Sequence, residues 1–128
     1  MSNGIVTLES AFSFADTVRR LQAAFTGHGI KVFATIDQQA EAKAVGLAMP
    51  PTTLILFGNP KGGTPLMLAQ PSSGLDLPLK ALVTENSPGR VEVSLNDAGY
   101  VIERHALPAA LAANIAPAAD LIAATLKA

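Results

Sequence analysis

The sequence has no cysteine and no tryptophan, and only 15% of its 128 residues carry a charge. Without cysteine the chain cannot form disulfides, cysteine-ligated zinc sites, iron–sulfur clusters or a thiol nucleophile. The nine Lys and Arg residues are scattered, with Arg19 and Arg20 as the only adjacent pair, and there are five Phe and one Tyr. A nucleic-acid-binding surface needs a basic stripe and aromatic side chains for stacking. We therefore expect no nucleic-acid partner.

No apolar run approaches the ~20 residues that a membrane-spanning helix needs, so the sequence predicts no membrane association. Residues 1–4 also lack the basic and apolar regions of a signal peptide, and we expect a cytoplasmic protein. Apolar residues nevertheless make up 49% of the chain. With so few charges, some of this apolar surface needs a partner, and a homodimer is the simplest way to cover it.

The hydrophobic pattern of the first half predicts strands that alternate with helices. The β-branched run Ile5–Glu9 predicts a first strand. Apolar residues at helical spacing follow Ser13, whose side chain can cap a helix of about 14 residues. Alternation from Ile30 to Asp37 predicts a second strand, and Asp37 can cap a short helix that ends at Gly46.

Three further strands are expected in the second half. Thr52–Phe57 is continuously apolar, which indicates a strand covered on both faces. Alternating residues in 77–83 and 91–95 predict two strands joined by a hairpin with a three-residue loop, Asn86–Pro88. That register places Lys80 diagonal to Glu92, an ion pair worth ~0.5 kcal/mol if exposed.

The C-terminal part, residues 108–127, is rich in alanine and predicts a helix that Pro108 can start and Pro117 can interrupt or restart. The whole chain, 1–128, is then one α+β domain. We expect a mainly antiparallel sheet of about five strands in the order β-α-β-β-β-β-α. The N- and C-terminal helices pack on it, and short helices lie in the connections.

The glycine-rich stretch 58–64 follows a strand and precedes a helix, as phosphate-binding loops do. Pro65, however, stands where a nucleotide-binding loop needs further glycine and a lysine, and it removes a backbone donor. We interpret the stretch as a rigid turn in which Asn59 caps Pro60, while Pro65 starts a short helix, with an anion-binding helix start as the alternative.

Few residues qualify as site residues. Two histidines are too few for a metal site without clustered carboxylates, so no metal and no cofactor is expected. Asp37 and Glu85 are explained as a helix cap and a hairpin residue. The candidate ligand-binding residues are Asn59, Lys61, Asp76, Lys80 and His105.

Three segments together resemble a known family: 57–67 with Gly-Asn-Pro, 74–80 with Leu-Asp-Leu-Pro-Leu-Lys, and Glu103–His105. The chain is similar over about residues 5–107 to the domain-of-unknown-function 302 family. The resemblance implies a fold similar to the TATA-binding-protein-like folds, commonly seen as homodimers. It implies no catalytic residue, because the family has no established activity.

These observations favour a homodimeric binding domain without catalysis, holding a small apolar or amphipathic ligand. An enzyme is the first alternative, with an acid–base site formed by Lys80 or His105 together with Asp37 or Glu85. The second alternative is a protein–protein interaction module whose exposed strand or alanine-rich helix binds a partner.

Overall fold

The computed structural model describes residues 3–128, and five strands in that range form one antiparallel sheet. The order across the sheet is β1-β5-β4-β3-β2. This confirms the expected single α+β sheet architecture. The strands are β1 (Ile5–Glu9), β2 (Lys31–Asp37), β3 (Thr52–Gly58), β4 (Leu79–Ser87) and β5 (Arg90–Asn96).

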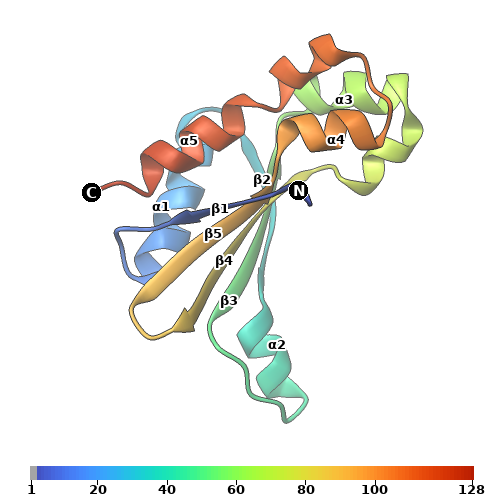
Figure 1. Ribbon diagram of the computed structural model, residues 1–128. Coiled ribbons are helices and arrows are strands. Elements are labelled where there is room, and N and C mark those ends of the chain that lie inside the picture. Colours follow the sequence, from blue (N-terminus) through green and yellow to red (C-terminus); the bar gives the residue numbers. More distant parts are fainter. Residues whose placement is uncertain (1–2) are drawn as a thin grey trace.

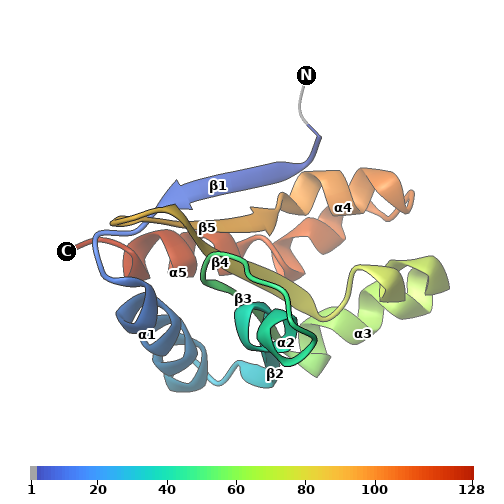
Figure 2. The same ribbon diagram turned by 90° about the horizontal axis from the view of Figure 1, so that it is seen from below.

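Helices lie against one face and at both ends of the sheet. Figure 1 shows α1 and α5 side by side on one face, α3 and α4 gathered beyond one end of the strands, and α2 beyond the other. Figure 2 again places α1 next to α5. The helices are α1 (Phe14–Gly27), α2 (Gln38–Ala44), α3 (Pro60–Ala69), α4 (Ala98–Arg104) and α5 (Pro117–Thr125), with 3-10 helices η1 (Pro71–Leu75) and η2 (Ala109–Asn114).

The expected helix caps are present. Ser13 Oγ accepts a hydrogen bond from the Asp16 amide (3.2 Å), and Asp37 Oδ1 accepts one from the Ala40 amide (2.9 Å). Each bond satisfies one of the amides that the first helical turn leaves without an intrahelical partner. The Asp16 side chain does not hydrogen bond back to Ser13. It pairs with Arg20 one turn later (2.9 Å).

The main core lies between the sheet and the α1–α5 pair. Because side chains alternate across a strand, every second residue of β3, β4 and β5 faces these helices. The Phe25 and Phe57 rings stack at its centre, with centroids 4.0 Å apart and planes 13° from parallel. The fully buried members of this core include Leu21, Phe25, Ile55, Phe57, Ala81, Val83, Val93 and Ile122.

The prediction that β3 is covered on both faces is wrong. Ile55 and Phe57 are buried under the helices, but Leu54 and Leu56 point to the opposite face and stay partly exposed. Leu82 of β4 pairs with Leu54 on that same face. An apolar run indicates two-sided burial only where crossover helices cover both faces, and antiparallel connections do not supply them. We call this surface, which includes Leu54, Leu56 and Leu82, the open face.

The hairpin between β4 and β5 is tighter than expected. Ser87 pairs with Arg90, so the turn is Pro88–Gly89 rather than a three-residue loop. Gly89 has φ +80°, a conformation that L side chains rarely adopt and glycine adopts freely. An irregularity in β4 between Thr84 and Ser87 restores the alternation.

The shorter turn shifts the register by two residues, so the predicted faces are right but the predicted ion pair is wrong. Val83 pairs with Val93, which removes Glu92 from the diagonal position beside Lys80. Glu92 lies instead 3.6 Å from Arg90 on its own strand.

Two helices differ from expectation. α3 starts at Pro60 and continues through Pro65, so the turn-then-helix interpretation is wrong. Asn59 supplies the start, because its carbonyl accepts the amides of Gly62 and Gly63, each at 2.9 Å. Helix α4 was not predicted, although Asp97 caps it by accepting the Tyr100 amide (3.1 Å). Near the C-terminus the chain first forms the 3-10 helix η2, and the α-helix α5 then starts at Pro117. Of the two predicted roles of Pro117, interrupting or restarting the helix, the restart is present.

Candidate functional site

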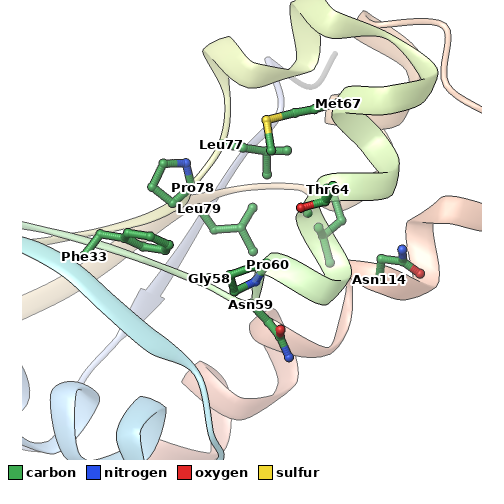
Figure 3. Close-up of a pocket in the computed structure, with 12 residues that line it drawn as sticks. Phe33, Gly58, Asn59, Pro60, Thr64, Met67, Leu77, Pro78, Leu79 and Asn114 are labelled. Atoms are coloured by element: carbon green, nitrogen blue, oxygen red, sulfur yellow. The ribbon is translucent and has the colours of Figure 1, made fainter.

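A cavity of about 240 Å³ opens where β3 leads into α3. Figure 3 shows its walls: the Gly58–Pro60 turn, the side of α3 that carries Thr64 and Met67, and the segment around Pro78. The peptide bond between Leu77 and Pro78 is cis. The lining residues are Phe33, Gly58, Asn59, Pro60, Gly63, Thr64, Met67, Leu77, Pro78, Leu79, Asn114 and Ile115.

Two asparagine side chains are the main polar groups of this cavity. Asn59 Oδ1 accepts the Lys61 amide (3.0 Å), which leaves its side-chain nitrogen as a donor. Asn114 Nδ2 donates to the Gly62 carbonyl (3.1 Å), which leaves its side-chain oxygen as an acceptor. Neither remaining atom has a hydrogen-bond partner among residues 3–128. With the Thr64 hydroxyl, the two asparagine side chains supply the polar side-chain groups in mostly apolar walls.

A second hollow of about 240 Å³ lies next to the first. It continues toward the end of α1 and the start of α5, with His28 and Leu121 among its lining residues. The two hollows are neighbours, because they share part of their walls. The residues that line both are Gly58, Asn59, Leu79, Asn114 and Ile115.

The structure separates the five candidate ligand-binding residues. Asn59 lines the cavity. Lys61 is exposed on the first turn of α3 and does not line it. Lys80 belongs to the open face, where it borders a shallow hollow with Leu82 and Ser94. Of these three candidates, Asn59 lines the cavity, and Lys61 and Lys80 lie elsewhere.

Asp76 and His105, the other two candidates, meet in a buried cluster beyond the sheet. His105 Nε2 lies 2.6 Å from Asp76 Oδ2, and the two residues are 7% and 8% exposed. Arg104 Nη1 donates to both Asp76 oxygens (3.2 and 3.1 Å). Ser72 Oγ lies 2.8 Å from the other ring nitrogen of His105. The cluster ties η1 to the end of α4.

The acid–base pairs proposed from the sequence do not form. Asp37 caps α2, and Glu85 accepts the Gly89 amide in the β4–β5 hairpin (2.8 Å), both at the end of the sheet away from α3 and α4. Lys80 lies on the open face and His105 in the cluster with Asp76. Strand direction and the α4 turn place these groups at opposite ends of the sheet, so the predicted Lys80 or His105 site with Asp37 or Glu85 is wrong.

Sequence reasoning missed Phe33, Asn114 and Ser72. A local irregularity of β2 between Val32 and Ala34 turns Phe33, 45% exposed, toward the cavity. The signal that could have pointed to Asn114 is that it is the one amide side chain in the alanine-rich stretch 108–127. Within residues 3–128 there is no group of three or more His, Asp or Glu arranged to hold a metal. The same range contains no helix long and apolar enough to cross a membrane.

The sheet and its helices define a small α+β domain, and the cavity beside Asn59 lies where β3 leads into α3. The family model described as "Domain of unknown function DUF302" matches residues 6–127, and the chain belongs to that family. This confirms the resemblance carried by the Gly-Asn-Pro and Leu-Asp-Leu-Pro-Leu-Lys segments.

A solved structure supports the fold. The crystal structure of an uncharacterized conserved DUF302 protein from Bacillus stearothermophilus superposes with a TM-score of 0.81. The match covers 98% of this chain and 97% of that one, at 18% identity.

Two curated relatives carry a functional name. Both are called "Fluoride-specific ion channel FluC 1", from Brucella suis biovar 1 (strain 1330) and Brucella abortus biovar 1 (strain 9-941). Each is 44% identical over 107 residues, which is 84% of this chain. The chain spans only about two fifths of the length of these relatives, 42% and 40%.

Proposed function

We propose that this chain is a small-molecule binding domain whose ligand occupies the cavity beside Asn59. The supporting observation is the cavity itself, a mostly apolar hollow whose walls include the side chains of Asn59, Asn114 and Thr64. Binding sites of this kind combine apolar walls with a few placed polar groups.

The lining indicates which ligands fit. No Asp, Glu, Lys or Arg lines the cavity, so a charged ligand would lose its hydration there without an ion-pair partner. A volume of about 240 Å³ is slightly below the roughly 300–1,000 Å³ of drug-sized sites. The proposed ligand is therefore small, neutral and apolar or amphipathic, with an amide, carbonyl or hydroxyl group that can bond Asn59 and Asn114.

A thermal-shift screen of small neutral compounds tests this proposal, because a ligand that binds only the folded state raises the melting temperature. Compounds that stabilise the wild-type chain should lose most of their effect on Phe33→Ala, which removes one wall. Leu68→Ala is the matched control, since Leu68 is 79% exposed on α3 and does not line the cavity. A screen without hits, or hits unaffected by Phe33→Ala, contradicts the proposal.

The proposal includes a homodimer formed through the open face. Leu54, Leu56 and Leu82 give this face an apolar centre. Its ends differ in charge: Lys80 lies at one, while Glu9 and Glu92 share a single cation, Arg90, at the other. A two-fold axis parallel to the sheet and perpendicular to the strands lays the basic end of one copy over the acidic end of the other.

The fluoride-channel relatives favour a second candidate function, an accessory domain for a membrane ion channel. The similarity covers less than half of each relative, and residues 3–128 contain no helix that could span a membrane. Conduction would then belong to the rest of those relatives, and this domain would sense or bind something beside it. Sodium fluoride, added to the thermal-shift screen against sodium chloride, checks whether the domain responds to that ion. The cytoplasmic location expected from the sequence stays a prediction.

A further inference from the structure

A chain of hydrogen bonds outside the cavity joins a hydroxyl, an imidazole and a carboxylate. Ser72 Oγ lies 2.8 Å from His105 Nδ1, and His105 Nε2 lies 2.6 Å from Asp76 Oδ2. The three residues come from η1, from the end of α4 and from the loop just after η1. Neither the cavity beside Asn59 nor the open face includes them.

The bonding pattern fixes the direction of each hydrogen bond in the neutral imidazole. A carboxylate only accepts hydrogen bonds, so Nε2 must carry the proton and donate it to Asp76. Nδ1 then has a free lone pair and accepts the hydroxyl proton of Ser72. A serine that donates to an imidazole, which in turn donates to a carboxylate, is the arrangement that turns a hydroxyl into a nucleophile.

The three residues joined by these hydrogen bonds differ in burial, as catalysis by a serine nucleophile requires. The side chains of His105 and Asp76 are 4% and 11% exposed, whereas Ser72 is exposed to solvent. Arg104 donates to both oxygens of the Asp76 carboxylate. The buried Asp76 carboxylate therefore fixes the ring orientation of His105, while the Ser72 hydroxyl stays accessible to solvent.

We propose that Ser72 is a nucleophile toward carboxylic esters, with His105 as general base and Asp76 as the residue that positions the imidazole. Here Nδ1 faces the serine and Nε2 faces the carboxylate. Nδ1 takes the serine proton, and Nε2–H remains bonded to Asp76 in both charge states of the imidazole.

The reaction balances with water as the only co-reactant. Ser72 Oγ forms a bond to the acyl carbon while its proton passes to His105 Nδ1. The bond from the acyl carbon to the alcohol oxygen breaks, and that oxygen takes the proton from Nδ1. Water then attacks the acyl-Ser72 ester, gives one proton to Nδ1, and Ser72 Oγ recovers that proton as the acid leaves.

The neighbouring surface indicates the acyl group. Side chains three residues apart eclipse one another on a 3-10 helix, so Leu75 lies on the same side of η1 as Ser72. Leu75 is 73% exposed, and a short apolar acyl chain bound at Ser72 would cover it. The proposed substrates are esters of short apolar acids.

The test exposes the 128-residue chain to a fluorophosphonate and maps the modified residue by mass spectrometry. We expect modification at Ser72 and not at Ser94, whose hydroxyl bonds Thr7 (3.0 Å) rather than an imidazole. General-base assistance contributes roughly 10²–10⁴-fold, so His105→Gln should slow labelling by about 100-fold or more. Leu75→Ser should lower the hydrolysis of p-nitrophenyl butyrate relative to p-nitrophenyl acetate.

Absence of label at Ser72, or labelling at the same rate in His105→Gln, overturns the proposal. Because His105 is buried, the His105→Gln variant could lose its fold. The Ser72→Ala variant therefore provides a second, independent test. Ser72 is exposed and loses one hydrogen bond, so this variant should keep its circular dichroism spectrum and lose p-nitrophenyl acetate hydrolysis. Hydrolysis unchanged in folded Ser72→Ala also overturns the proposal, whereas Ser94→Ala should behave as wild type.

Discussion

Asn59 combines two tasks in one side chain. Its oxygen caps α3 by accepting the Lys61 amide (3.0 Å), and the residue lines the cavity. The residue follows β3 and precedes Pro60, whose fixed φ suits the first helical position. The helix cap and the proposed ligand contact therefore involve the same residue, and substitutions can separate their effects.

Asn59→Ala should lower the free energy of unfolding by about 1 kcal/mol, because an amide of the first turn loses its cap. Asn59→Asp should keep the cap, since a carboxylate oxygen accepts the same bond, but it places a charge in the apolar cavity and abolishes binding of neutral ligands. Chemical denaturation measures the first effect and thermal shift with a screening hit measures the second. Equal stability of all three chains would show that Asn59 does not cap α3.

At the scale of the element, α3 is shaped by its two glycines. A Cβ added at Gly63 would lie 3.8 Å from Leu77 Cδ1, an ordinary contact, whereas at Gly62 it would lie 3.0 Å from the Asn114 carbonyl oxygen. Gly62 thus permits η2 to approach α3 closely, and the bond from Asn114 to its carbonyl holds the two together. Gly63 has no such constraint.

Gly63→Ala should raise the free energy of unfolding by about 0.5–1 kcal/mol, because alanine loses less backbone freedom in a helix. Gly62→Ala is the matched variant and should gain nothing or lose stability, since its methyl group displaces η2. Urea unfolding of both variants decides the matter. A gain at Gly62 equal to that at Gly63 would show that the close approach of η2 carries no cost.

Local patterns predicted the elements better than the contacts between them. Ile5–Glu9, the Ser13 cap and the Asp37 cap follow from neighbours in sequence, and each is present. The meeting of Asp76 with His105 depends on α4, a helix that the sequence analysis did not predict. Asn114 reaches the cavity through the packing of η2 on α3, and no sequence spacing encodes that contact.

At the scale of the whole molecule, the sheet is covered on one face only. The helices α1 and α5 bury the core on that side, as Figure 1 shows. Leu54, Leu56 and Leu82 remain partly exposed on the other. Such an apolar area on a chain with 15% charged residues is best covered by a second copy.

The wild-type chain should therefore sediment as a dimer, and Leu82→Glu should sediment as a monomer because it places a carboxylate at the centre of the proposed interface. Leu68→Glu, on the exposed side of α3, is the control and should remain dimeric. Sedimentation velocity over a range of concentrations measures this. A monomeric wild type, or a dimer that Leu82→Glu leaves intact, contradicts the open face as the interface.

The central claim, a neutral ligand bound between Asn59 and Asn114, has one direct measurement. Side-chain amide signals in a ¹H–¹⁵N NMR spectrum can be followed while a compound from the thermal-shift screen is titrated into the chain. The account predicts that the Asn59 and Asn114 amides shift together, with the same dissociation constant, while the Gln22 amide, which bonds Thr35 beside α1 (2.8 Å), stays in place. Shifts confined to residues of the open face or of the Ser72–His105 cluster would contradict it.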